Sequence, residues 1–519
     1  MENSDNTHVG CQHIAGARTR RDFFKLVSDG IYGTALTYLL CQDLYGGTGK
    51  LTPEATGESN LGRRSVYDLK PRSPQFEPKA KAVIQFLMNG APSQMDLFDP
   101  KPMLEKHRGE LPEQFKKPDG ASAVAEVRGL LPSPFKFAQH GKSGLWLSDA
   151  MPYLAEQVDD IAVIRSMNTP SPVHFLGLYV LQSGEIRSGQ PTLGAWTVYG
   201  LGSMNQNLPA FIVLDDPAGL PVNGVENWQN GYLPPIYQGT RLRSNGAPVL
   251  DLQPEVADPP EMVKLGRGLL NQLDLLHKRE RPAQNQLDAR IATYELAARM
   301  QVGASTALDI SEESKETLDM YGVGQKPRIQ GVTYKNPGPD NFARRCIMAR
   351  RLVERGVRFV QICLDAPIWD QHVALEQDLR AACDRTDKPV AALLKDLKQR
   401  GLLDSTLVVW AGEFGRLPLG QMHNPGSTDN PTNAVGRDHN GHGFSVWLAG
   451  GGIKGGTAYG VTDDVGYKTV ENPVSVADFH ATILNQLGLD YRQLFYEVDG
   501  KQERLTSNFD AKVVKEIIA

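Results

Sequence analysis

Short, continuous apolar runs recur along the chain between glycines and polar residues. A run of this length without polar alternation is typical of a strand that is buried on both faces of a sheet. The first run contains a single polar residue, Gln85, and ends at Asn89-Gly90. The runs that predict strands are Ala82–Met88, Ile161–Ile164, Phe211–Leu214, Val357–Leu364, Leu407–Trp410 and Phe444–Leu448.

Segments with helical periodicity alternate with these strands. Gly356 and Gly401 each end a helix directly before a strand, and polar loops follow the strands. This order predicts an α/β fold, with a doubly wound, mostly parallel sheet flanked by helices. In such sheets ligands bind beyond the carboxyl ends of the strands. The predicted helices are His174–Leu181, Pro260–Met300 with a break at Pro282, Phe342–Glu354, Ala381–Arg400 and Val474–Leu487.

The N-terminal part differs in composition from the rest of the chain. Residues 1–45 include TRRDFFK, Thr19 to Lys25, before a mostly apolar or small segment. This pattern resembles a twin-arginine leader and predicts export by that machinery to a periplasmic or extracellular location. The alternative is a cytosolic amphipathic helix. Residues 46–78 are rich in Gly, Pro and Ser and predict a linker or extended arm. Residues 79–519 then form one domain, with an irregular insertion near 217–248.

The totals exclude some classes of protein. With 55 basic and 60 acidic residues the net charge is −5, which argues against nucleic acid as a partner. The chain contains no apolar stretch of about 18 residues or more, so no transmembrane span is expected. The five cysteines include no CxxC pair, so a structural zinc knot is not expected.

The segment GRDHNGH, Gly436 to His442, carries the densest group of candidate ligands. Asp438, His439 and His442 lie within five residues, directly before a predicted strand. Carboxylate oxygen and neutral imidazole both bind divalent first-row metals, and a loop can turn several of them toward one ion. The alternative is a set of hydrogen bonds that only orders a Gly- and Asn-rich loop.

Two further polar segments follow predicted strands. WDQH supplies Asp370 and His372, which are two residues apart in an extended loop and therefore point to the same side. GEFGR supplies Glu413 as a ligand or base, and Arg416, whose planar fork suits an oxyanion, phosphate or sulfate. The alternatives are a loop that caps the next helix and a local salt bridge.

Two candidates lie nearer the N-terminus. Ser93 and Asp96 follow the first strand, where Ser93 is a candidate nucleophile or ligand and Asp96 a candidate metal ligand. Both are also common turn residues. His174 opens a helix shortly after Ser171, and a helix N-terminus favours an anion. An N-terminal cap with a half-buried histidine is the alternative there.

These segments, taken in order, resemble domain-of-unknown-function family 1501, in the superfamily of alkaline phosphatases, sulfatases and metal-dependent phosphoglycerate mutases. The resemblance runs from the leader almost to the C-terminus. It rests on APSQMDLFDPKP (Ala91 to Pro102), HGKSGLWLSDAMPYLA (His140 to Ala155), IRSMNT (Ile164 to Thr169), ARRLVERGVRFVQI (Ala349 to Ile362), WDQH, LLDSTLVVWAGEFGR (Leu402 to Arg416) and GRDHNGHGFSVWLAGGGIKGG (Gly436 to Gly456).

The resemblance implies an alkaline-phosphatase-like sheet with one or two divalent metals, zinc, manganese or calcium, at the strand ends. Glu413-Phe414 stand where sulfatases have Asp-His, so one imidazole is lost, and Asp438, His439 or His442 could replace it. The segment from Pro170 to Gly184 resembles the sulfatase helix that begins with the nucleophile. It contains no cysteine, so a formylglycine mechanism is not expected.

The sequence thus predicts a metal-dependent hydrolase of a phosphate or sulfate ester. The ligand candidates are Asp96, Asp370, His372, Glu413, Asp438, His439 and His442, and the catalytic candidates are Ser93, His174 and Arg416. The substrate would be a small-molecule or glycan ester. Two alternatives stay open, which are an exported binding protein without turnover and an isomerase like the phosphoglycerate mutases. Whether Ser93, Ser171, His174 or water attacks is also open.

Overall fold

The computed structural model describes residues 69–116, 127–243, 259–280, 285–422, 435–507 and 510–519. Residues 65–519 form one compact unit. Its centre is a nine-stranded sheet in the order β15-β5-β14-β9-β1-β8-β6-β7, with β18 also paired to β5. The strands are β1 (Ala82–Leu87), β5 (Ile161–Asn168), β6 (Phe211–Leu214), β7 (Thr240–Leu242), β8 (Phe359–Cys363), β9 (Thr406–Ala411), β14 (Phe444–Ala449), β15 (Thr457–Tyr459) and β18 (Val474–Ser475).

One strand of this sheet runs against the others. β1 pairs in parallel with β8 and β9, and β6 pairs in parallel with β7 and β8. β14 is antiparallel to both β5 and β9. The carboxyl ends of β5, β9, β1, β8 and β6 therefore share one edge, and β14 begins at that edge. The predicted mostly parallel sheet is confirmed.

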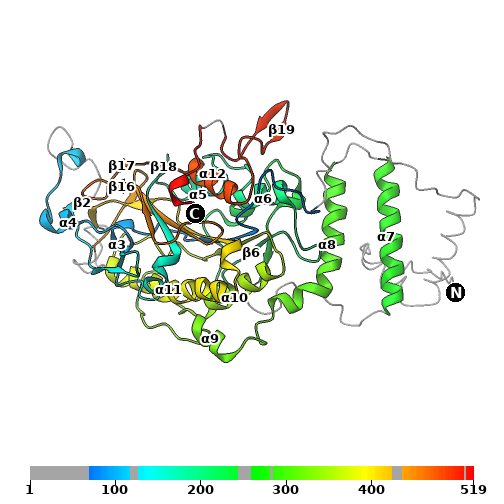
Figure 1. Cartoon of the computed structure of the whole chain (residues 1–519), viewed down its shortest axis with the longest axis horizontal. Helices are drawn as coiled ribbons and strands as arrows, with labels where there is room; N and C mark the ends of the chain where they lie inside the picture. Colours follow the sequence, from blue (N-terminus) through cyan, green and yellow to red (C-terminus); the bar gives the residue numbers. More distant parts are fainter. Residues whose placement is uncertain (1–68, 117–126, 244–258, 281–284, 423–434, 508–509) are drawn as a thin grey trace, which may run out of the picture. The chain divides into compact units, whose positions relative to one another are not determined.

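Helices cover both faces of the sheet (Figure 1). α10 (Asp340–Glu354) and α11 (Leu375–Gln399) lie on one face, where Phe342 stacks on Phe86 of β1 with ring centroids 5.8 Å apart. α5 (His174–Ser183), α6 (Leu193–Leu201) and α12 (Val476–Gln486) lie on the other. The doubly wound arrangement follows from strands that are apolar on both sides, since each face must be covered.

Shorter elements surround the edge where the strands end. They are α3 (Gln94–Leu97), α4 (Pro102–Lys106), β10 (Gly415–Arg416) paired with β13 (His439–Asn440), and β11 (Leu419–Met422) between β12 (Val435–Gly436) and β2 (Val127–Leu130). The β10–β13 pair joins Arg416 to His439 and Gly415 to Asn440. It fixes the two loops that follow β9 and precede β14 against each other.

Three further helices lie between β7 and α10 in the chain: α7 (Pro260–Glu280), α8 (Asn285–Leu308) and α9 (Lys315–Tyr321). α8 packs against α10 and the short helix at Pro235–Tyr237, and α7 lies beside α8 (Figure 1). Among the described residues, no helix combines the length and the apolar character needed to cross a membrane.

Some sequence expectations fall outside the described residues, namely the leader at 1–45, residues 46–68 of the linker and the end of the 217–248 insertion. Residues 69–78 run along the domain, where the Arg72 amide donates to Leu201 and the Gln75 amide to Gly488. The described part of the insertion contains a short helical turn, Gly224–Trp228, that packs against α5. Its fixed contacts place it beside the helix that begins with His174.

Candidate metal centre

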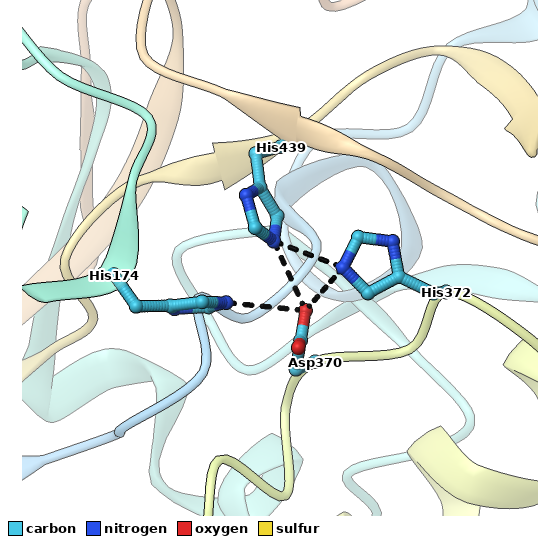
Figure 2. A group of neighbouring side chains, drawn as sticks. All are labelled: His174, Asp370, His372 and His439. Atoms are coloured by element: carbon cyan, nitrogen blue, oxygen red, sulfur yellow. Dashed lines mark hydrogen bonds and ion pairs between the residues drawn. The ribbon is translucent and has the colours of Figure 1, made fainter. Parts of the chain in front are cut away.

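Four side chains converge at the edge where the parallel strands end. His174, Asp370, His372 and His439 each offer one ligand atom, and these atoms lie within 4.8 Å of one another. Figure 2 shows the three imidazoles pointing at the Asp370 carboxylate from different sides. The Nε2 atoms of His372, His439 and His174 lie 2.9, 3.2 and 3.3 Å from Asp370 Oδ1. We call these four residues the His/Asp cluster.

The sheet explains why residues so distant in sequence meet here. Asp370 and His372 lie in the loop after β8, and His174 opens α5 after β5. His439 precedes β14, the antiparallel strand, so the start of β14 lies where its neighbours end. Phe444, the first residue of β14, is aligned with Met167 near the end of β5. The four ligand atoms therefore come from three loops at one edge.

Two glycines let these loops approach closely. A Cβ at Gly436 would overlap the backbone of Gln371 and His372. A Cβ at Gly177 would lie 3.0 Å from a ring carbon of Phe414 and 3.3 Å from Glu413 Cβ. Gly177 is one turn after His174 in α5, so the bare helix face brings His174 onto the segment after β9. Any side chain at Gly436 would push the His439 loop away from His372.

In His174 and His372, the Nε2 atom points at Asp370 and the Nδ1 atom has a hydrogen-bond partner of its own. Glu413 Oε1 accepts from His174 Nδ1 at 2.6 Å, and Gln421 Oε1 accepts from His372 Nδ1. Glu413 is fully buried and also accepts from the Gly90 and Ala91 amides, at 2.9 and 3.3 Å. Such partners hold the proton on Nδ1 and turn the Nε2 lone pair toward the centre, as is usual for histidines that bind a metal.

The electrostatics of the cluster favour a positive charge at its centre. Burial alone would lower the pKa of His174, but the nearby carboxylates of Asp370 and Glu413 raise the pKa to about 9. Burial would raise the pKa of Asp370, yet Arg416 and the three histidines hold that pKa well below its usual range. Burial lowers the pKa of His439, which favours the neutral imidazole that ligates metals.

The residues fit a divalent metal ion. Imidazole nitrogens and carboxylate oxygens bind zinc at about 2.0–2.2 Å, so neighbouring ligands lie roughly 3 Å apart, and an ion held by four of them takes water or an ester oxygen as a fifth ligand. His174 Nε2 is buried, and its 3.3 Å contact with Asp370 Oδ1 does not have the geometry of a hydrogen bond. A buried ring nitrogen without a hydrogen bond is costly unless something else binds it. The cluster is also open to small molecules, since its side chains are between 14% and 26% exposed.

A family model described as "Protein of unknown function (DUF1501)" matches residues 80–518. The chain belongs to the DUF1501 family. The resemblance predicted from the sequence motifs is therefore confirmed. No curated protein matches the chain.

The solved structures that match this chain include a sulfatase, a phosphonate monoester hydrolase and an alkaline phosphatase. The PsFucS1 sulfatase from Pseudoalteromonas sp. is 12% identical, with a TM-score of 0.32, and the match covers 80% of this chain and 68% of that chain. The phosphonate monoester hydrolase SpPMH from Silicibacter pomeroyi is 13% identical, with a TM-score of 0.29 and 71% of each chain covered. Alkaline phosphatase from the Antarctic bacterium TAB5 is 8% identical, with a TM-score of 0.28 and coverages of 73% and 94%.

In this DUF1501 chain, two of the residues predicted as a ligand and a nucleophile lie apart from the cluster. Asp96 forms a fully buried ion pair with Arg437, with Oδ2 2.7 Å from Nε and Oδ1 3.1 Å from an Nη atom. The Ser93 hydroxyl donates to Asp96 and is also buried. We call Ser93, Asp96 and Arg437 the buried trio. Both oxygens of Asp96 are satisfied by protein groups.

Arg416 joins the loops that carry the cluster. Its guanidinium donates to Asp370 Oδ1 at 2.6 Å and to the carbonyls of Ala91 and Arg437 at 2.9 and 3.2 Å. It also donates to the carbonyls of Gly90 and Trp369, and it is 1% exposed. Such an arginine orients Asp370 and ties together the ends of β1, β8 and β9.

The other predicted residues surround the cluster without joining it. Asp438 Oδ1 accepts from the His439 amide at 2.8 Å and lies 3.9 Å from His372 Nδ1. His442 is exposed and stacks edge-on against Tyr467, with ring centroids 5.2 Å apart. Ser171 Oγ accepts from the Val173 amide at 3.3 Å. Of the six ligand candidates in the C-terminal part, three belong to the cluster, namely Asp370, His372 and His439.

A pocket lies along α5 and shares two loops with the cluster. Its volume is about 690 Å³. Thr169 and Pro170, which lead into His174, form one side, and Gly441 and His442, which follow His439, form another. Val180, Ile186 and Val476 supply apolar wall, while Asn168, Lys468 and Ser475 supply polar groups. Its size suits a small organic group or a sugar unit.

Sequence reasoning did not find three residues that shape the centre. Gln421 bonds to His372, Arg437 neutralises Asp96, and Phe414 packs against both His174 and His439 with ring centroids 4.9 and 4.7 Å away. Arg437 directly precedes the Asp-His pair and Phe414 directly follows Glu413, so proximity in sequence was the available signal. Gln421 carried none, because a single glutamine in a short strand such as β11 is ordinary.

Proposed function

We propose that this protein is a metal-dependent hydrolase of a phosphate or sulfate ester. The observation that carries the proposal is the convergence of three imidazole nitrogens and one carboxylate oxygen within 4.8 Å. The convergence lies at the carboxyl edge of a parallel sheet, where such folds bind their ligands. Binding and polarising an anionic ester is the chemistry that this donor set supports best.

The donor set favours zinc or manganese over calcium. Calcium prefers six to eight oxygen ligands, whereas this cluster offers three nitrogens and one carboxylate. When bound, such an ion polarises an ester oxygen and lowers the pKa of a water molecule. The four residues of the cluster suit a single ion. We therefore propose only these four as ligands, out of the wider set that the sequence predicted: His174, Asp370, His372 and His439.

The surrounding residues position the ligands and handle protons. Glu413 fixes the His174 tautomer, and Gln421 does the same for His372. Arg416 holds Asp370 in place. The Asp438 carboxylate is 30% exposed and lies beside His372, so it is the acceptor best placed to take a proton from an attacking group.

Water is the nucleophile that we favour. Ser93 is fully buried and its hydroxyl is bonded to Asp96. Ser171 is 5% exposed, and its hydroxyl caps the turn that precedes α5. The Nε2 atom of His174 points at Asp370 and is needed as a ligand. A water molecule that reaches the partly exposed cluster meets none of these obstacles.

The organic part of the ester would occupy the pocket along α5. Apolar walls and scattered hydrogen-bonding groups suit a small molecule or a glycan unit, and the exposed Lys468 suits an anionic substrate. The loops of His174 and His439 form part of this pocket. A substrate held there would therefore lie next to the cluster.

We also propose that the protein acts in the periplasm or outside the cell after twin-arginine export. The support is the TRRDFFK motif at Thr19 to Lys25. Replacing Arg20 and Arg21 together by lysine should retain the protein in the cytoplasm, as measured by cell fractionation and immunoblotting. Unchanged fractionation of the double variant would remove the export proposal and leave the catalytic one intact.

Metal content and ester turnover test the catalytic proposal together. The protein is purified without chelators, its metals are measured by elemental mass spectrometry, and phosphate and sulfate esters are screened with the metal found. His372→Ala should lose the metal and the turnover. His107→Ala is the matched control, because His107 lies outside the cluster, where it pairs with Glu110 at 2.9 Å.

The outcomes separate the alternatives. Stoichiometric metal together with turnover supports the hydrolase, provided that both are lost in His372→Ala and kept in His107→Ala. Metal without turnover of any ester, together with tight binding of one glycan or anion, selects the binding protein. Conversion of a phosphosugar without net hydrolysis selects the isomerase. Protein that takes up no metal from a panel of divalent ions rules out the proposed chemistry.

A further inference from the structure

α7 exposes an apolar surface that no described element covers. Figure 1 shows this helix beside α8, on the side of α8 away from the sheet. Leu265 is 63% exposed and Met262 is 48% exposed, while Leu273 and Leu276 are each 42% exposed. Helices in proteins owe most of their stability to the packing of an apolar face. A helix that also contains Gly266 and Gly268 is a poor candidate to stand uncovered.

Four of the exposed apolar residues, together with the half-buried Leu269, form a narrow seam, and the exposed Leu270 and Leu275 lie outside it. Met262, Leu265, Leu269, Leu273 and Leu276 follow one another at spacings of three, four, four and three. At about 100° per residue they cover roughly 80° of the helix surface. That width is the one of the contact face in a two-helix coiled coil, and the spacing departs from the alternating steps of three and four by one residue, at the step from Leu269 to Leu273. We call these five residues the α7 seam.

The α7 seam is symmetric about its middle residue. The spacing reads the same from either end, so Leu269 of two antiparallel copies would meet at a twofold axis. Met262 would then oppose Leu276, and Leu265 would oppose Leu273. A surface that contacts its own copy across a twofold axis must be self-complementary in this way.

The charges beside the seam favour the same arrangement. Glu261 and Arg279 are 18 residues apart, which is five turns, so they lie on the same flank of the helix. An antiparallel pair brings the Glu261 end of each helix to the Arg279 end of the other. A parallel pair would instead put the two copies of this flank on opposite sides of the interface, so Glu261 would gain no arginine partner from it.

We propose that α7 is the dimerisation surface of this protein and that its occupant is α7 of a second copy, packed antiparallel through the α7 seam. A membrane surface is a weaker candidate occupant. Interfacial helices typically carry Trp or Phe on the apolar face, whereas α7 has neither aromatic residue, and its four Lys and Arg residues are accompanied by three acidic ones.

The mass of the purified full chain in solution tests this proposal. Light scattering after gel filtration, over a wide range of loading concentrations, should give twice 57.0 kDa. Leu265→Glu with Leu273→Glu should halve that mass, because both positions lie in the seam. Leu275→Glu should leave it unchanged, since Leu275 is 51% exposed but lies about 120° around the helix from the seam. Circular dichroism confirms that each variant folds.

Charge reversal tests the antiparallel orientation. Glu261→Arg should weaken the dimer several-fold, because it places arginine beside Arg279 of the partner. Adding Arg279→Glu should restore the dimer, since the pair is then reversed on both copies.

Three results would overturn the proposal. The first is a wild-type protein that stays monomeric at every concentration, whether or not it sediments with lipid vesicles. The second is a dimer that survives the double substitution in the seam. The third is a loss of the dimer in Leu275→Glu as large as in the double variant. Failure of the double charge reversal to restore the dimer would overturn the antiparallel arrangement. None of these measurements depends on catalysis.

Discussion

The His/Asp cluster and the buried trio lie near the same edge of the sheet and use a carboxylate in opposite ways. Asp96 of the buried trio has both oxygens bonded to Arg437, and neither side chain is exposed. Asp370 of the cluster lies under three imidazoles, and its side chain is 14% exposed. A carboxylate matched to one buried arginine fastens two loops. A carboxylate facing several ring nitrogens and solvent can exchange those contacts for a ligand.

The largest expected effect is a loss of stability when the ion pair of the buried trio is removed. Asp96→Ala leaves Arg437 charged and buried, so it should lower the free energy of unfolding by about 3–5 kcal/mol. Urea denaturation followed by fluorescence measures this loss. The folded fraction should bind metal with unchanged affinity. Weaker metal binding at undiminished stability would show instead that Asp96 is a ligand, as the sequence suggested.

The converse substitution removes a ligand from the cluster. His439→Ala should weaken metal binding by about 3–4 kcal/mol, roughly a quarter of what a four-ligand zinc site provides. Competition with a fluorescent chelator gives the affinity. His442→Ala is the control, because His442 lies three residues away in the same loop and outside the cluster. Equal losses in the two variants would contradict the assignment of His439.

A smaller effect is expected from the partner of His174. Glu413→Gln keeps the shape but removes the charge that fixes the imidazole, so metal affinity should fall about 10- to 100-fold. Glu313→Gln serves as the control. Glu313 pairs with Arg350 and Arg351 at 2.7 and 2.5 Å, and its loss should affect stability rather than metal affinity. An unchanged metal affinity in Glu413→Gln would mean that Glu413 only accepts the hydrogen bonds of the Gly90 and Ala91 amides and does not support the metal ligand.

His480 extends the comparison to a histidine that is fully enclosed. Its Nε2 donates to the Leu181 carbonyl at 2.8 Å, and burial lowers its pKa from 6.5 to about 4. Between these values the unfolded chain binds more protons than the folded one. The stability that His480 contributes is thus complete above pH 6.5 and is lost as the pH falls toward 4.

The expected size of that effect is about 2 kcal/mol between pH 7.5 and pH 5. His480→Gln keeps a donor for Leu181 and cannot titrate, so it should remove this part of the pH dependence. Urea unfolding of both proteins at the two pH values gives the difference. Identical pH dependence in wild type and variant would mean that His480 is not held neutral by the fold.

The elements that the sequence predicted best are those with the simplest burial. β1 and β6 are apolar on both faces, so a continuous run locates them, and Phe211–Leu214 has the predicted bounds. α6 was not predicted, because Leu193–Leu201 is buried throughout and therefore shows no polar face. α11 begins at Leu375, before the predicted Ala381, since its first turns carry acidic residues that weaken the apolar signal.

For the site, the sequence indicated which loops matter better than which side chains point inward. It predicted Asp370, His372 and His439 as ligands in polar segments next to strands, and the fold brings these three side chains together with His174, whose role the sequence left open. It could not separate Asp96 from Asp370, because the deciding partners, Arg437 and the histidines, are distant in sequence. Likewise, the hydrogen bond between Glu413 and His174 forms because Gly177 lets α5 approach the segment after β9 closely, which the sequence did not indicate.

The position of β14 has a consequence for the order of assembly. This strand lies between β5 and β9, so the sheet has a gap until residues 444–449 have been synthesised and inserted. His439 arrives with the same segment. We therefore expect the centre to form among the last steps of folding, because contacts so distant in sequence form late. A chain truncated before Phe444 should take up no metal, and metal uptake during refolding should report completion of the sheet.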